Sequence, residues 1–266
     1  MFPFIIIIVA VLALVSIISF KVLTAWGNRW GATPEECAAP MTGDAYLAGG
    51  PRARIAMTRA VSINQPPEVV WPWLAQLGRG AGWYSYDRLD NGGKTSARHL
   101  VSWIPGPQLG DASPIGYLRY LEPGREMVWW VSGEQFLGAR VRMVVDLLVM
   151  PGNPGSRLVI RISGDAAGPT ASLAVGLFQV IDTLMARRQL LGIKDRVEAY
   201  GVRTADPELP ETGRRDQYQY YEVIYASGQT AGVPGKEHAP LWRRMAIEEK
   251  VLVDSQEQPK GTPENE

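Results

Sequence analysis

The chain has 266 residues, of which 46% are hydrophobic and 20% are charged, so its composition allows a sizeable hydrophobic core. Its 27 basic residues balance 27 acidic residues, and the basic pairs are scattered, which argues against nucleic acid as a partner. The single cysteine, Cys37, excludes an internal disulfide framework, and the two histidines, His99 and His238, lie in no metal-ligand spacing. We therefore expect one domain with appendages and neither a metal nor another cofactor.

The N-terminus carries the clearest physical signal. Residues 2–20 are apolar except for two serines and are long enough, as a helix, to cross a hydrocarbon core of roughly 30 Å. A cleaved signal peptide is the alternative, but its basic start, shorter apolar run and small-residue cleavage site are not seen here. We therefore predict residues 1–26 as a transmembrane anchor in contact with the lipid bilayer. Lys21 and Arg29 follow the apolar run, and this bias favours a single-pass cell-membrane protein with a cytoplasmic soluble domain.

The segment after the anchor has two parts. Residues 27–53 are rich in Gly, Pro, Ala and Thr and show little periodicity, which is typical of a linker. Residues 55–63 alternate between larger and smaller side chains and predict a strand, after which Pro67 begins a short apolar helix. Pro72 lies inside this helix and removes a backbone donor, so we expect the helix to be kinked or broken there. Residues 79–114 look irregular.

Four more strand candidates follow, and short turns rich in Gly and Pro separate them, as suits antiparallel hairpins. They cover residues 115–121, 126–132, 139–150 and 157–163. In the third and fourth, charged residues alternate with apolar ones, so one face of the sheet is expected to be wet and the other buried. Glu126 and Asp146 are accordingly predicted to point outward.

The longest soluble helix is predicted over residues 171–200, with Gly201 as its stop. Its apolar stripe consists of Leu173, Leu177, Ile181, Leu184, Met185, Leu191 and Val197. A curved antiparallel sheet with such a helix across its concave side encloses a cavity instead of a solid sandwich.

Two motifs carry a resemblance to a known family: Pro-Pro-Glu-x-Val-Trp-Pro-Trp-Leu-x-Gln-Leu-Gly at residues 66–78 and Leu-Gly-Ile-Lys-Asp-Arg-Val-Glu at residues 191–198. Over residues 54–201 the chain resembles the SRPBCC (START-like) helix-grip superfamily, and it looks most like the bacterial polyketide cyclase/dehydratase-like branch. The resemblance implies an α+β fold in which a curved antiparallel sheet surrounds a long C-terminal helix. Since this fold hosts carriers, cyclases and ligand sensors, the resemblance is only weakly specific for function.

Aromatic side chains are candidates for a pocket that grips a small hydrophobic ligand, such as a lipid or a polyketide-like molecule. The candidate ligand-binding residues are Trp83, Tyr84, Tyr86, Trp103, Tyr117 and Trp130, although large rings are core material first. His99 is a candidate general acid or base, with a surface histidine as the alternative. A membrane-anchored binding protein is the leading interpretation. A cyclase- or dehydratase-like enzyme and a non-catalytic envelope scaffold remain open.

The C-terminal part lies outside the resemblance. Residues 202–253 combine a tyrosine-rich stretch with an amphipathic pattern and predict a partly ordered extension. Residues 254–266 are polar and are predicted to be disordered.

Overall fold

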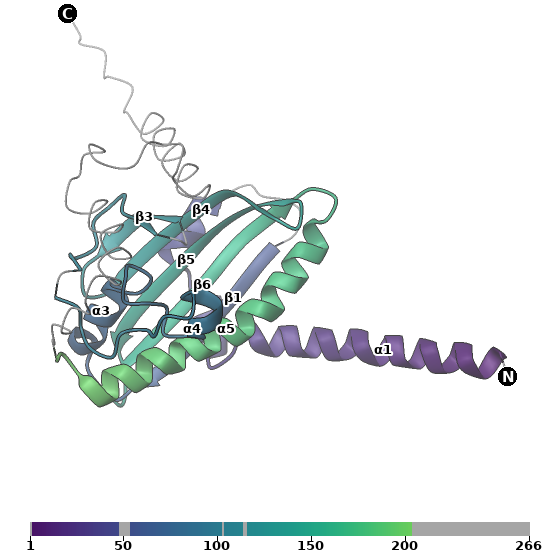
Figure 1. Ribbon diagram of the computed structural model, residues 1–266, viewed down its shortest axis with the longest axis horizontal. Coiled ribbons are helices and arrows are strands. Elements are labelled where there is room, and N and C mark those ends of the chain that lie inside the picture. Colours follow the sequence, from purple (N-terminus) through teal and green to yellow (C-terminus); the bar gives the residue numbers. More distant parts are fainter. Residues whose placement is uncertain (1, 48–53, 103, 114–115, 204–266) are drawn as a thin grey trace, which may run out of the picture.

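The computed structural model describes residues 2–47, 54–102, 104–113 and 116–203 (Figure 1). Its centre is one curved, antiparallel, six-stranded sheet in the order β1-β6-β5-β4-β3-β2. The strands are β1 (Arg54–Ile63), β2 (Ala112–Ser113), β3 (Gly116–Glu122), β4 (Glu126–Phe136), β5 (Ala139–Pro151) and β6 (Ser156–Ala167). The two-residue β2 was not predicted, and each of the others overlaps a predicted strand.

Helices cover the sheet and extend from it. They are α1 (Phe2–Gly27), α2 (Pro34–Ala38), the 3-10 helix η1 (Thr42–Leu47), α3 (Pro67–Ala75), α4 (Asp87–Asp90) and α5 (Ala171–Tyr200). Helix α5 crosses one face of the sheet, while α1 projects away from the body (Figure 1). This arrangement is the helix-grip fold that the sequence resemblance implies, and the expectation is confirmed.

Two helix predictions can be compared with the structure directly. Helix α5 has the predicted bounds, and it ends where Gly201, with φ of 56°, donates its N–H to the carbonyl of Val197 at 3.0 Å. A positive φ strains residues that carry a Cβ, so glycine suits this stop. Helix α3, by contrast, continues through Pro72 and is not broken there. The donor that Pro72 lacks would pair with the carbonyl of Glu68, in the first turn of the helix, so one intrahelical bond is lost there.

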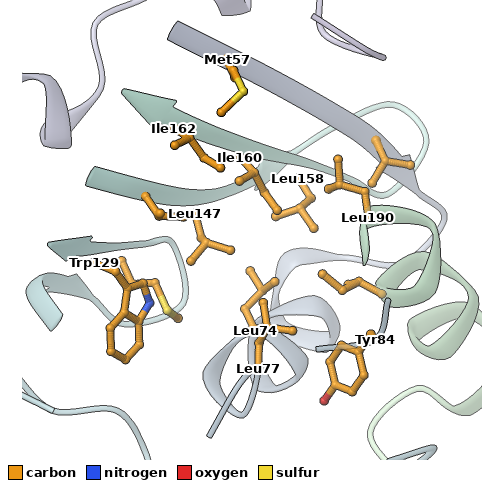
Figure 2. Packing of buried hydrophobic residues seen from close by; sticks show 14 of the residues in the cluster. Met57, Leu74, Leu77, Tyr84, Trp129, Leu147, Leu158, Ile160, Ile162 and Leu190 are labelled. Carbon is orange, nitrogen blue, oxygen red and sulfur yellow. The ribbon is translucent and has the colours of Figure 1, made fainter. Parts of the chain in front are cut away.

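The main core fills part of the space between the concave face of the sheet, α3 and α5 (Figure 2). Leu147, Leu158 and Ile160 point from β5 and β6 toward Leu74 and Leu77 of the α3 region. All five are buried, and each side chain of this size contributes roughly 1.5–3 kcal/mol when it leaves water. The alternation read from the sequence therefore identifies the concave face correctly.

Residues 28–47, which were predicted as part of a linker, instead pack against the sheet, and we call them the strap. The amide of Thr58 donates to the carbonyl of Asn28 at 2.7 Å, and the amide of Ala60 donates to that of Trp30 at 3.1 Å. Because β1 is an edge strand, these bonds satisfy groups that would otherwise be open to pairing with another chain. The strap then continues over the convex face of the sheet.

Arginine side chains from β6 hold the strap in place. Arg161 donates to the carbonyls of Glu36 and Ala39 near the end of α2, each at 2.7 Å, and to Asp44 at 2.8 Å. Arg157 binds the carboxylate of Glu36 at 2.6 Å. A guanidinium beside the carbonyl end of a helix is electrostatically favourable. The charged face of β6 therefore anchors the strap, and the prediction that this face is wet is wrong for the part that the strap covers.

The carboxylates of Asp146 and Glu126 were predicted to point outward, but η1 covers both of them. Asp146 is 0% exposed and Glu126 is 5% exposed. The amide of Gly43 donates to Asp146 at 3.0 Å, and the Thr42 hydroxyl donates to Glu126 at 3.1 Å. Burial, with a further contribution from the charge of Glu126, raises the pKa of Asp146 to about 7.

Because the pKa of Asp146 is higher in the folded chain than in the unfolded chain, stability should fall as the pH rises from about 4 to about 7. We expect urea unfolding of the detergent-solubilised chain to show lower stability at pH 8 than at pH 5, with about 2–3 kcal/mol of the difference arising from Asp146. Asp146→Asn should remove this part of the difference, whereas the exposed control Asp195→Asn should keep it. An unchanged pH response in Asp146→Asn would contradict the assignment.

Candidate functional site

A cavity of about 310 Å³ lies between α5, the concave face of the sheet and the segment that joins α3 to α4. The sheet contributes Met143, Val145, Leu147, Ile160 and Ile162, and α5 contributes Phe178, Ile181, Asp182, Met185, Ala186 and Gln189. The remaining wall is formed by Leu77, Trp83, Ser85 and Asp90. The walls are mainly apolar, and the volume falls at the lower end of the range that small-molecule sites occupy.

A second cavity of about 190 Å³ lies under the first turns of α5. Met143 and Phe178 line both cavities, so these two side chains form the partition between them. The rings of Phe136 and Phe178 meet edge to face with their centroids 6.4 Å apart. Methionine is flexible and aromatic rings can rotate, so a change of rotamer at the partition would join the two spaces.

A buried ion pair forms the polar end of the larger cavity. Arg59 Nη1, on β1, lies 2.5 Å from Asp182 Oδ2, on α5, and the two side chains are only 1% and 18% exposed. The Nε of Arg59 donates to the carbonyl of Gly27 at 2.6 Å, and its Nη2 donates to the Thr183 hydroxyl at 3.3 Å. Burial raises the pKa of Asp182, and the charge of Arg59 opposes this rise. One guanidinium thus connects the sheet, α5 and the end of α1.

A second carboxylate, Asp90 at the end of α4, lines the same cavity. Its Oδ1 is buried and has no hydrogen-bond partner among the described residues. Burial is the main cause that raises the pKa of Asp90, and hydrogen bonding of the carboxylate with Ser85 opposes this rise. An acceptor without a partner in a mainly apolar cavity can bind a donor group of a ligand.

The aromatic loop after α3 carries Trp83 and Tyr84, and of these two residues Trp83 faces the cavity. Trp83 lines the cavity, where its carbonyl accepts a hydrogen bond from Gln189 at 3.2 Å. Tyr84, with φ of 59°, is 1% exposed and accepts a hydrogen bond from Gln76 at 2.7 Å. A Cβ at position 192 would clash with the carbonyl of Tyr84, so Gly192 allows this loop to approach α5. Tyr84 therefore holds the loop in place and does not line the cavity.

The other predicted site residues lie apart from the cavity. Tyr86 is 43% exposed at the start of α4, and His99 is not among the residues that line either cavity. Tyr117 and Trp130 pack with η1 side chains on the convex face of the sheet, opposite the cavity. Trp103 lies outside the described residues. Of the five aromatic candidates that the structure describes, Trp83 is the one in the cavity wall.

Sequence reasoning missed the polar residues of the cavity. Neither Asp182 nor Asp90 was predicted to lie in a ligand site. The signal for Asp182 was present, since it is the one charged residue between Ala171 and Ala186. A single charge in an apolar stretch of helix costs free energy unless it is paired, so it points to a buried partner such as Arg59.

No group of three or more His, Cys, Asp or Glu side chains within the described ranges is placed to hold a metal ion. No family model and no curated protein matches the sequence.

Solved structures similar to this one include a protein from Mesorhizobium loti, with 16% identity and a TM-score of 0.34 over 54% of this chain and 96% of that chain. DynU16, from the dynemicin biosynthetic locus, has 16% identity and a TM-score of 0.35 over 59% of this chain and 51% of that chain. The di-domain ARO/CYC BexL from the BE-7585A biosynthetic pathway has 16% identity and a TM-score of 0.38 over 58% of this chain and 53% of that chain. The chain therefore spans about half the length of these last two proteins.

We expect Arg59→Met to destabilise the detergent-solubilised chain by about 3–5 kcal/mol at pH 7, because it leaves the carboxylate of Asp182 buried without its counter-ion. The double variant Arg59→Met/Asp182→Leu should recover most of this loss, since apolar side chains fill the same space. As a control, Arg142→Met removes one partner of the more exposed Arg142–Asp165 pair and should cost about 1 kcal/mol or less. Urea unfolding measures all three, and a double variant no more stable than Arg59→Met would contradict this description.

Proposed function

We propose that this chain is a membrane-anchored protein that binds a small hydrophobic molecule between α5 and the sheet. The observation that carries the proposal is the cavity of about 310 Å³ with its mainly apolar walls. Protein interiors are usually packed to crystal-like density, so an unfilled apolar space of this size needs an explanation. A bound ligand supplies one, and a scaffold with an interior filled by its own side chains does not fit the cavity.

The walls limit the chemistry of the ligand. Aliphatic and aromatic side chains surround most of the space, which favours a hydrocarbon chain or fused rings, as in a lipid or a polyketide-like molecule. The free Oδ1 of Asp90 favours a hydroxyl or amine on one end of that molecule. Trp83 offers a ring surface in the same wall. The second cavity behind Met143 and Phe178 offers room for a longer tail.

Helix α1 supports the membrane part of the proposal. Within the described residues, Phe4–Gly27 is the helix long and apolar enough to span a membrane, and the most apolar part of it makes no buried contacts. Trp26 is 52% exposed at its end, where an interfacial aromatic residue is expected. Lys21 and Arg29 follow the apolar run, and this bias supports a single-pass protein with its domain in the cytoplasm.

A second candidate function is catalysis by a cyclase- or dehydratase-like enzyme. It is favoured by the two carboxylates, Asp90 and Asp182, in one apolar cavity, both with a raised pKa. Such a carboxyl group can act as a general acid or base when a proton leaves a carbon next to a carbonyl. A co-purified ligand that loses water on incubation with the chain, but not with Asp90→Asn, would establish the enzyme.

Ala186→Leu tests the binding proposal directly, because the larger side chain projects into the cavity from α5. We expect the affinity for a dansyl-labelled fatty acid, measured by fluorescence with the full chain held in amphipol, to fall about tenfold or more. The extra carbons occupy space that the probe needs.

Ala199→Leu is the matched control, since Ala199 is exposed on the same helix and does not line either cavity. It should bind the probe like the unmodified chain. Equal affinities for the two variants, both folded by circular dichroism, would show that the probe binds elsewhere.

A further inference from the structure

Part of the apolar stripe predicted for α5 faces outward. Leu173, Leu177, Ile181 and Leu184 have exposed fractions between 39% for Leu177 and 67% for Leu173. Their spacing places them on one side of the helix, and we call them the outer stripe. A row of large exposed apolar side chains marks a surface that contacts something other than water.

One side of the outer stripe adjoins α1. A Cβ at Gly176 would lie 3.3 Å from the ring of Phe20, and a Cβ at Gly27 would clash with the side chain of Thr183. In both contacts the α1 residue and the α5 residue are separated by the same number of positions in the sequence. The last turns of α1 therefore run parallel to this part of α5. On this register the outer-stripe residue Leu177 lies level with Lys21, at the end of the apolar run of α1.

The other side of the outer stripe adjoins the cavity. Ile181 is 47% exposed and also lines the cavity, together with Phe178 and Met185 from the same helix. Going around α5, one therefore meets α1, then the outer stripe, then the mouth of the cavity. In Figure 1 the first half of α5 lies on the side of the body from which α1 projects.

The charges near the outer stripe fit a lipid interface. Between Ala171 and Ala186 the one charged residue is Asp182, which is paired with Arg59 on the inner side of the helix. The exposed Arg187 and Arg188 follow immediately, and the guanidinium of Arg187 lies 5.2 Å from the centre of the Trp30 ring. Apolar side chains followed by arginine and tryptophan are the order expected from acyl chains to head groups.

We propose that the outer stripe rests in the bilayer beside α1, so that an apolar ligand passes between lipid and cavity at Ile181 without crossing water. This inference rests on the proposed binding function and names the membrane as the source of the ligand. Lipid is the occupant that continuity with α1 favours. A second copy of the chain and residues 204–266 are the alternative occupants, and the test separates lipid from both of them.

Depth-dependent quenching tests where the outer stripe lies. In the full chain, Cys37→Ser removes the native cysteine, and Leu177→Cys carries an environment-sensitive fluorophore. The matched control carries the same fluorophore on Leu109→Cys. The native Leu109 side chain is 63% exposed and lies away from α5. In vesicles of phosphatidylcholine and phosphatidylglycerol that contain brominated lipid, the Leu177 label should lose most of its fluorescence and the Leu109 label should keep it.

Three results would overturn the inference. If both labels are quenched, the body lies on the membrane without a specific face. If the Leu177 label is neither quenched nor in an apolar environment, the stripe faces water. If its emission is that of an apolar environment but brominated lipid does not quench it, protein covers the stripe.

Ligand uptake tests the second half of the inference. Leu173→Ser/Leu177→Ser lies outside the cavity walls, so the affinity for the dansyl-labelled fatty acid in amphipol should not change. Uptake of the same probe from the vesicle membrane, followed by energy transfer from tryptophan, should slow about tenfold, because the stripe no longer enters the lipid. The control Leu109→Ser/Val202→Ser removes two other exposed apolar side chains and should leave the uptake rate unchanged.

The experiments distinguish failure of the entry route from failure of the binding function. Unchanged uptake by Leu173→Ser/Leu177→Ser, together with normal binding in amphipol, would overturn entry from the bilayer and leave the binding function standing. Failure of the unmodified chain to bind the probe in amphipol would overturn the binding function, and with it the entry route.

Discussion

The arrangement around the cavity depends on the buried guanidinium of Arg59. From β1 it reaches the carboxylate of Asp182 on α5 and the last carbonyl of α1, that of Gly27. A buried charge must keep its partners, so the pair fixes the position of α5 relative to β1 at this point. The buried pair thus lies at one end of the hollow space and also ties the end of the apolar helix to the body.

The two faces of the sheet then serve different purposes. The convex face is covered by the strap, which Arg157 and Arg161 hold through Glu36 and Asp44. The concave face holds the cavity under α5. Because the strap continues directly from α1, the sheet is bound on one face by the chain that leads to the apolar helix and on the other by α5, which contacts that helix. The body is therefore placed close to α1 and not held away from it by a flexible linker.

The sequence predicted the helices and strands well, but it predicted poorly what packs against each of them. Alternation identified the long strands, and helical periodicity with Gly201 identified both ends of α5, because these patterns are local. The strap escaped prediction because the hydrogen bonds that fix it to the body come from β1 and β6, which are distant from it in the sequence. Asp146 was placed outward because alternation shows two faces without showing what covers them. Leu173 and Leu177 were grouped with core residues, since an apolar stripe looks the same whether it faces a core or lipid.

Native mass spectrometry of the detergent-solubilised full chain, after exposure to a lipid extract, tests the central claim most directly. If the space between α5 and the sheet is a binding site, a fraction of the chain should carry one apolar molecule, and Ala186→Leu should reduce that fraction while Ala199→Leu does not. Recovery of the folded, unmodified chain without any bound molecule would contradict the account.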